Sequence, residues 1–294
     1  MRLNRRNILS LTASAVAMIF TTMPVIAQSN IEKVDAVAGL LPQTIQDTGV
    51  LRIAVPDVGK PLAYKEGNTL KGMDADLAEA VAKVLGLKAE INLIPFSAAL
   101  TGLQANKFDI SFGEFYVTAE RLKVADFVTA WQDYSSFLVI KAKDYKPVKL
   151  EDICGHTVGA MAGSAELETL KSASAKCSDK APTVSAFPSI SNAILALNSG
   201  RVEGVLINRG GAQEAINLDA GLDASGEIGG GPTATAVSRN ENSEKLLQAL
   251  KGAYDYLIES GHYMQILQKN DTAYGAVKNA EIYTQSSTPP KYGF

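Results

Sequence analysis

Residues 99–109, ALTGLQANKFD, recur as residues 193–203, AILALNSGRVE, at a constant offset of 94. Each copy joins an amphipathic segment to a turn, a basic residue, an apolar residue and an acid, and a β-rich run follows. Strand-like and helix-like runs also alternate before each copy, from LRIAV at 51–55 and from TVGAM at 157–161. This alternation is typical of a doubly wound, mostly parallel sheet. The chain is therefore predicted to be α/β, with two similar lobes.

The repeat also predicts where the two lobes face each other. Continuing its register along the strands sets Glu114 opposite Asn208, each at the carboxyl end of its strand. Ligands of open α/β sheets bind outside that end of the strands. A polar pair is thus expected at the facing edges of the lobes.

Two strands are expected to connect the lobes, near residues 139–143 and 233–238, since a helix-like segment at 242–261 returns to complete the first lobe. Two such connections form a hinge. The predicted boundaries are 49–142 and 237–284 for lobe one, 143–236 for lobe two, and 285–294 for a loosely held C-terminal tail. Residues 28–46 are expected to be loosely held as well, because few apolar residues stand there in register.

The N-terminal segment, residues 1–27, has the three regions of a secretory signal peptide: arginines without an acid, an apolar run, and small residues before a cleavage site. The apolar run is interrupted by Ser and Thr and is shorter than the roughly 20 residues that span a bilayer. Cleavage would leave 25 basic against 31 acidic residues, a balance that offers no basic surface to nucleic acid. We expect a freely diffusing periplasmic protein that binds no nucleic acid.

The cysteine and histidine content argues against a metalloenzyme. Two cysteines and two histidines cannot form a four-ligand Cys/His zinc site without carboxylates, and no nucleophile motif accompanies either histidine. No metal or cofactor is therefore expected. An exported protein folds in an oxidising compartment, so Cys154 and Cys177 are expected to form a disulfide, the alternative being two buried thiols.

The stretch EFYVTAER, residues 114–121, joins the end of a strand to a predicted helix capped by Thr118. Arg121 then falls in the first turn, where a cation opposes the helix dipole at a cost of about 0.3–1 kcal/mol. A surface ion pair with Glu120 or Asp126 could offset that cost. So could a ligand carboxylate, which a guanidinium binds through two parallel hydrogen bonds. The residues alone leave both interpretations open.

Six motifs follow one another in the order LRIAV, LKGMDADLAEAVAKVLG, LQANKFDIS, VTAERLKVADF, VGAMAGSAELE and ALNSGRVEGVLIN. Their arrangement, over about residues 51–270, resembles the bacterial extracellular solute-binding proteins of family 3, which deliver polar amino acids to ABC importers. The resemblance implies a type II periplasmic-binding-protein fold whose two lobes close on a ligand, a membrane permease as partner, and a monomer. It also implies binding without catalysis.

The resemblance further implies a set of ligand-binding residues. They are Arg121 for the ligand α-carboxylate, Glu114 and Tyr116 beside it, Phe96 against the ligand side chain, the turn at Ser164 and Ala165 as a second carboxylate-binding element, and Asn208 for the remaining polar groups. Cys154 and Cys177 fall where some family members carry a disulfide.

Three positions depart from the family. Asn208 stands where an Asp usually binds the ligand ammonium, Gly59 where a second aromatic usually lies, and Glu114 where a small polar residue is usual. Glu114 could bind the ammonium instead, or pair with Arg209 when the lobes close. These changes favour an amino-acid-like solute that is opine-like, a secondary-amine conjugate or a larger cationic derivative.

Two other functions stay open at the level of the sequence. The same fold hosts periplasmic cyclohexadienyl dehydratases, which act on prephenate-like acids, and Glu166 or Glu114 could supply the acid that such an enzyme needs. A ligand-sensing module that reports to a membrane receptor is the other alternative. The sequence identifies neither the solute nor the permease.

Overall fold

The computed structural model describes residues 30–178 and 180–294. The proposed signal peptide, residues 1–27, lies outside the described residues. Within the described chain, no helix combines the length and the apolarity needed to cross a bilayer. Residues 31–294 form one structural unit.

The main sheet has the strand order β4-β1-β5-β10-β6-β9-β7-β8, with β11 paired to β6. Its strands are β1 Val50–Pro56, β4 Lys88–Ile94, β5 Ile110–Tyr116, β6 Asp126–Ile140, β7 Thr157–Met161, β8 Thr183–Phe187, β9 Gly204–Asn208, β10 Leu222–Val237 and β11 Glu281–Tyr283, and a separate hairpin holds β2 Tyr64–Glu66 and β3 Thr69–Lys71. The α-helices are α1 Asp35–Ala38, α2 Gln43–Thr48, α3 Met73–Val84, α4 Ala99–Gln104, α5 Ala165–Ser174, α6 Ile190–Asn198, α7 Arg209–Leu218, α8 Ser243–Glu259 and α9 His262–Lys269.

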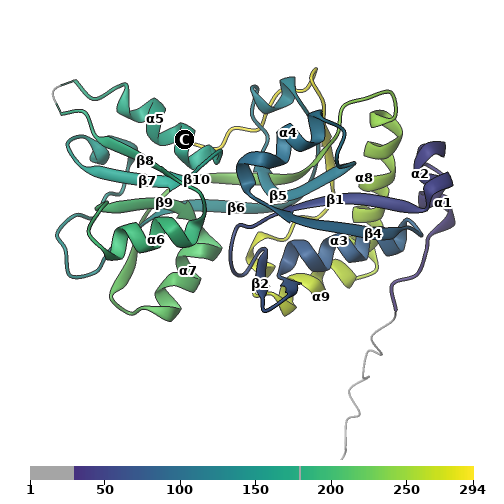
Figure 1. Ribbon diagram of the computed structural model, residues 1–294, viewed down its shortest axis with the longest axis horizontal. Coiled ribbons are helices and arrows are strands. Elements are labelled where there is room, and N and C mark those ends of the chain that lie inside the picture. The colour runs from purple at the N-terminus through teal and green to yellow at the C-terminus, as the bar shows by residue number, and fades with distance from the viewer. Residues whose placement is uncertain (1–29, 179) are drawn as a thin grey trace, which may run out of the picture. The chain divides into compact units, whose positions relative to one another are not determined.

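Both ends of the sheet are doubly wound, which confirms the two-lobed α/β prediction. β1 pairs in parallel with β4 and β5, and β7 pairs in parallel with β8 and β9. In Figure 1, α4 lies above and α3 below the strands of lobe one, while α5 lies above and α6 and α7 below those of lobe two. One buried apolar cluster fills lobe one, whereas lobe two has a separate cluster for each face of its sheet.

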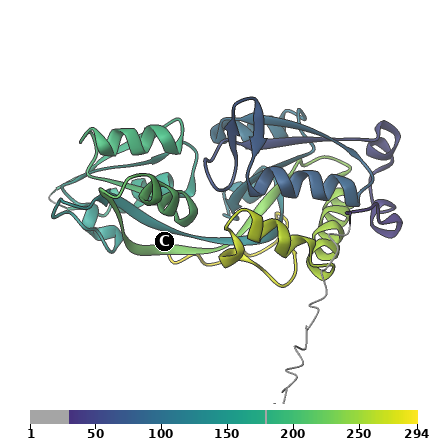
Figure 2. The ribbon, with the colours of Figure 1, turned by 90° about the horizontal axis from the view of Figure 1, so that it is seen from below.

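The strands β6 and β10 run through both lobes and pair with each other, antiparallel, along their length. In lobe one β10 pairs with β5 from Thr233 onwards, and in lobe two β6 pairs with β9 from Ser135 onwards. β10 therefore passes between the lobes before the predicted stretch 233–238, and β6 does so before the predicted stretch 139–143. The difference arises because β6 is one uninterrupted strand of 15 residues that enters lobe two well before the basic stretch behind it. Figure 2 shows the two strands side by side between the lobes.

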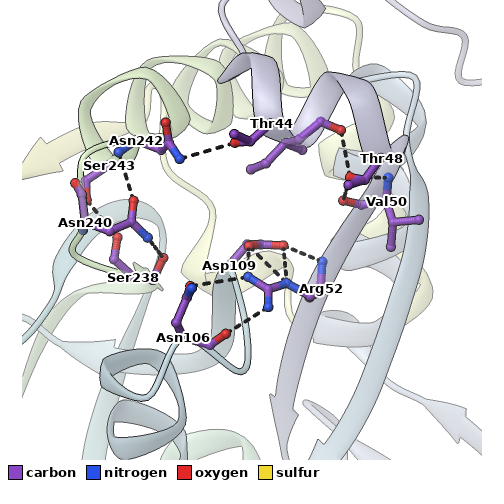
Figure 3. A network of polar contacts seen from close by, with 11 residues as sticks. Thr44, Thr48, Val50, Arg52, Asn106, Asp109, Ser238, Asn240, Asn242 and Ser243 are labelled. Carbon is purple, nitrogen blue, oxygen red and sulfur yellow. Dashed lines mark hydrogen bonds and ion pairs between the residues drawn. The ribbon is translucent and has the colours of Figure 1, made fainter.

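The acid that ends each copy of the repeat, Asp109 in lobe one and Glu203 in lobe two, has the same structural role in both lobes. Asp109 accepts the backbone N–H of Arg52 through Oδ2 at 2.8 Å, and Glu203 accepts that of Thr157 through Oε2 at 2.9 Å. Each carboxylate thereby joins the start of its own strand to the neighbouring strand. Asp109 is buried and also binds the Arg52 guanidinium, with 2.6 Å between Nη2 and Oδ1, while the Asn106 carbonyl accepts Nη1 of the same side chain (Figure 3).

The described part of residues 28–46 is ordered into helices, which differs from the prediction of a loosely held segment. It forms α1 and α2, and Leu41 and Ile45 are buried in the core of lobe one. The Asn242 side-chain amide donates to the Thr44 hydroxyl at 3.2 Å, which joins α2 to the start of α8 (Figure 3). A few apolar residues thus suffice to attach this segment to the core.

The C-terminal tail, residues 285–294, also differs from its prediction as a loose end. The Tyr292 hydroxyl accepts the N–H of Val117 at 2.7 Å and donates to the Pro232 carbonyl at 2.9 Å. The N–H of Gly230 donates to the Tyr292 carbonyl at 2.7 Å. Hydropathy does not predict these contacts because they come from one hydroxyl and from backbone groups.

The predicted disulfide is present in lobe two. Cys154 and Cys177 are bonded to each other, with their Cα atoms 5.7 Å apart. The bond joins the residue that follows the 3₁₀ helix Leu150–Ile153 to the segment behind α5. It therefore uses both cysteines of the chain and leaves no free thiol.

We expect Asp109→Asn to destabilise the protein by about 2–4 kcal/mol, because the Arg52 side chain and N–H lose a buried, charged acceptor. The matched change in lobe two, Glu203→Gln, should cost less than about 1 kcal/mol, because water screens an exposed ion pair. The Glu203 side chain is 45% exposed beside His156. Urea unfolding followed by circular dichroism measures both changes. Equal losses would contradict the view that the buried anchor of lobe one is the stronger.

Candidate functional site

The structure brings all seven predicted ligand-binding residues to one cavity between the lobes. They are Phe96, Glu114, Tyr116 and Arg121 from lobe one, and Ser164, Ala165 and Asn208 from lobe two. The rest of the wall consists of Val58, Gly113, Asp133, Met161, Glu166 and Thr233. The cavity measures about 30 Å³, which is room for about one or two water molecules but not for an amino acid. A solute of that size therefore needs the lobes to part before it enters.

Arg121 bridges the two lobes. Its N–H donates to the Thr118 hydroxyl at 3.2 Å, so Thr118 caps the turn as predicted, although the turn is the 3₁₀ helix Arg121–Lys123. Nη1 donates to the Tyr116 carbonyl at 2.9 Å, and Nη2 donates across the interface to the Gly163 carbonyl at 3.1 Å. Two neutral carbonyls thus hold a cation at the mouth of the cavity.

The surface alternative for Arg121 is wrong, because the two acids that could have paired with it have other partners. Lys123 binds Glu120 at 2.6 Å, and Arg239 binds Asp126. Within residues 30–178 and 180–294, none of the ion pairs includes Arg121. Burial lowers the pKa of its guanidinium, which is the electrostatic mark of a cation without a full counter-charge.

Aromatic and apolar side chains form the wall around this cation. The guanidinium carbon of Arg121 lies 5.4 Å from the ring centroid of Phe115 and 5.8 Å from that of Phe96. The two rings are tilted by 37° to each other, with their centroids 5.0 Å apart. Gly59 has a positive φ of 79° in a tight turn, and its neighbour Val58 lines the cavity instead. The second aromatic expected in the family is therefore replaced by a smaller, aliphatic surface.

Glu114 faces a second buried carboxyl that the sequence analysis did not assign to the site. Asp74 is 2% exposed in the first turn of α3, whose cap position is held by Gly72. The two residues line one small cavity, and Asp74 Oδ2 and Glu114 Oε1 are both buried without a hydrogen-bond partner among the described residues. Burial, together with the charge of Asp74, raises the pKa of Glu114 well above its usual range, and burial raises the pKa of Asp74 to about 6. Both shifts favour the protonated, neutral form of each buried carboxyl.

The expected pairing of Glu114 with Arg209 is not formed. The Arg209 guanidinium instead lies 4.7 Å from the ring centroid of Tyr274, over its face. The Tyr274 hydroxyl donates to Asp133 at 3.3 Å, so Arg209 acts on the acids of the cavity only from a distance. Glu114 has a φ of 44°, an uncommon conformation for a residue other than glycine, and this orientation directs the strand end toward Asp74.

Two more acids line the cavity beside the predicted residues. Asp133, on β6 just before the crossing, is 2% exposed, and burial raises its pKa to about 8 although it accepts the N–H of Tyr134 at 2.8 Å. Glu166 is 9% exposed and accepts the Ser135 hydroxyl at 2.9 Å. Asp133 gave no clear signal in the sequence, because it stands among the polar residues Gln132, Ser135 and Ser136 of β6, and Glu166 was considered only as a catalytic acid.

Asn208 and Ser164 each cap a helix that starts at the cavity. Asn208 Oδ1 accepts the N–H of Gly211 at 2.8 Å, so its side-chain amide offers the cavity a donor rather than an acceptor. Ser164 Oγ accepts the N–H of Leu167 at 3.1 Å, which orients the first turn of α5 toward Arg121. An ammonium group would consequently have to share Asn208 Oδ1 with the N–H of Gly211.

Comparisons with known proteins agree with this geometry. The model of the bacterial extracellular solute-binding proteins, family 3, matches residues 51–271. The probable amino-acid-binding protein YxeM of Bacillus subtilis is 27% identical over 233 residues, which are 76% of this chain and 84% of YxeM.

Two solved structures are similar along most of their length. An ancestral arginine-binding protein bound to arginine is 30% identical with a TM-score of 0.70, over 76% of this chain and 98% of that one. The ancestral amino acid-binding protein AncCDT-1, a precursor of cyclohexadienyl dehydratase, is 24% identical with a TM-score of 0.69, over 78% and 98% of the two chains. At that identity the second likeness shows the fold alone.

The raised carboxyl pKa values make the empty protein more stable in mild acid than in mild base. A carboxyl whose pKa is higher in the folded protein than in the unfolded chain binds extra protons in the folded state between the two values. The free energy of unfolding therefore falls as the pH rises. The contribution of Asp74 falls between about pH 4 and pH 6, and that of Asp133 falls between about pH 4 and pH 8.

We expect Glu114→Gln to flatten this pH dependence, because Gln presents a neutral group to Asp74, as protonated Glu114 does, and cannot lose a proton. The fall in unfolding free energy between about pH 5 and pH 8 should shrink by about 1 kcal/mol or more. Urea titrations at several pH values measure it, with Glu79→Gln on the exposed face of α3 as the control. An identical pH slope in Glu114→Gln and in the wild type would show that Glu114 ionises normally.

Proposed function

We propose that this chain, which belongs to family 3 of the bacterial extracellular solute-binding proteins, captures a cationic amino acid between its lobes and delivers it to the permease of an ABC importer. One observation carries the proposal: a cation held by neutral carbonyls and several buried carboxyls line the same interlobe cavity. A ligand with one negative and more than one positive group complements such a site.

The carboxylate of the ligand would bind Arg121. Its Nη2 is held only by the Gly163 carbonyl of lobe two, a contact that opens when the lobes part. A carboxylate that takes its place forms charge-assisted hydrogen bonds, which are stronger than bonds to a neutral carbonyl. The first turn of α5, at Ser164 and Ala165, would add backbone donors from lobe two when the lobes close again.

The positive groups of the ligand would bind the carboxylates of Asp133 and Glu166. Both are buried on the cavity wall, and each has neutral donors as hydrogen-bond partners. Asn208 would donate its side-chain amide to an oxygen of the ligand, and Phe96 would pack against the aliphatic part. Glu114, whose raised pKa favours its protonated form, would supply a neutral wall rather than a counter-charge.

Binding rather than catalysis fits this arrangement. The relatives named above are binding proteins, which supports this conclusion. Family membership and the composition of residues 1–27 support export to the periplasm, where a monomer would meet the permease.

Isothermal titration should give micromolar or tighter binding of L-arginine or of an arginine derivative substituted on its α-nitrogen. The substituted compound tests the opine-like alternative, because Asn208 leaves the α-nitrogen without the carboxylate that the family usually places there. L-Glutamine and L-glutamate serve as neutral and anionic controls of similar size. A preference for either control would contradict a cationic ligand.

Arg121→Ala should raise the dissociation constant of the bound amino acid by about 100-fold or more, since a ligand carboxylate loses a desolvated partner. The midpoint of thermal unfolding of the empty protein should move by less than about 4 °C. Arg201→Ala is the matched control, because Arg201 also lies over an aromatic ring, that of Phe187 at 5.5 Å, but outside the cavity. If Arg121→Ala binds the amino acid with unaltered affinity, the binding site must lie elsewhere in the protein.

A further inference from the structure

The last three residues of the chain, 292–294, form a strap at the place where the strands cross between the lobes. The chain reaches this place from β11, which pairs with β6 in lobe one. In Figure 1 the yellow end of the chain runs from lobe one to the C mark beside β10. The three hydrogen bonds of Tyr292 fasten the strap to Val117 of lobe one and to Gly230 and Pro232 of the crossing strand.

The glycine-rich part of β10 provides the seat for the strap. A Cβ atom on Gly229 would lie 2.6 Å from the Tyr292 carbonyl oxygen, and one on Gly231 would lie 3.1 Å from the Tyr292 ring. The first distance is shorter than any van der Waals contact, so a side chain at Gly229 would expel the strap. The glycines thus explain how the backbone of the tail approaches the crossing so closely.

The strap holds one residue of the cavity wall between its aromatic rings. The rings of Tyr292 and Phe294 meet that of Tyr116 edge to face, with centroids 4.7 and 5.2 Å apart and interplanar angles of 68° and 85°. Tyr116 is 4% exposed as a result. Edge-to-face contacts restrict the orientation of the ring that they enclose.

Tyr116 in turn positions both charges proposed to bind the ligand. Its carbonyl accepts Nη1 of Arg121 at 2.9 Å. Its hydroxyl lies 3.4 Å from the hydroxyl of Ser135, which donates to Glu166 at 2.9 Å. A continuous set of contacts therefore leads from residues 292–294 through Tyr116 to Arg121 in lobe one and to Glu166 in lobe two.

We infer that the strap positions Tyr116, and through it Arg121 and Glu166, so that the C-terminus of the chain takes part in ligand binding without touching the ligand. Tyr292 and Phe294 are positioning residues in this arrangement. The inference rests on the proposed function for the choice of ligand. The effect of the strap on the distance between the lobes can be measured without a ligand.

Deletion of residues 292–294 tests the inference by titration with L-arginine. The deletion should raise the dissociation constant about tenfold or more, because it removes three hydrogen bonds and both ring contacts. Tyr292→Phe and Phe294→Ala should each raise it by less, and Phe294→Tyr, which keeps the ring, should stay near the wild type. Circular dichroism and thermal unfolding establish that each variant is folded. Tyr256→Phe, on α8, is the matched control for the loss of a hydroxyl.

A dissociation constant of the deletion variant within twofold of the wild type would overturn the inference. If the wild type binds neither L-arginine nor its α-nitrogen-substituted derivative, the proposed function fails, and a second measurement decides on the strap. Spin labels on Lys65→Cys in lobe one and Gln213→Cys in lobe two report the interlobe distance of the empty protein, since both native cysteines are bonded. A longer or broader distance distribution after deletion supports the inference, and an unchanged one overturns it.

Discussion

The antiparallel pairing of β6 with β10 through both lobes is the constraint on which the site depends. Because the two strands stay hydrogen-bonded to each other, the lobes can bend about the crossing but cannot slide along it. The register of β10 against β6 shifts between Ser225 and Gly229 and again between Thr233 and Ala234. Such irregularities bend a strand locally, and these two lie on either side of the crossing. Bending is therefore concentrated beside Asp133 and Ser135.

The same constraint explains why charges can be buried in so small a cavity. An isolated cation such as Arg121, or an acid such as Asp133, is costly to remove from water. Here neutral carbonyls hold the Arg121 cation, and the raised pKa of Asp133 favours the neutral form of that carboxyl. The empty site thus keeps a cation without a full counter-charge beside buried carboxyls, and a solute that supplies the missing partners stabilises the closed lobes.

The fold and much of the site followed from the sequence, since both rest on repeated local patterns. The offset repeat predicted that Glu114 and Asn208 face each other, and both line the cavity. The family motifs identified Arg121 and Phe96. What each residue does there was harder to predict: Asn208 caps α7, and Glu114 is buried beside another acid, Asp74. Those roles depend on neighbours that are distant in sequence.

Asp74 shows why such neighbours were missed. An acid at the start of a helix is usually a cap, and only the packing of α3 against β5 turns this one inward. The tail was missed for a related reason, because two aromatic residues at the end of a polar segment have no periodicity to reveal them. Local patterns therefore predicted the framework, while contacts between distant segments determined the chemistry.

The position of the last residue has a practical consequence. Phe294 lies against Tyr116 at the crossing, so a tag joined after Phe294 would begin beside the hinge. A purification tag or fluorescent domain placed there would compete with the aromatic contacts for the same space. An affinity handle placed away from residues 292–294 avoids that interference.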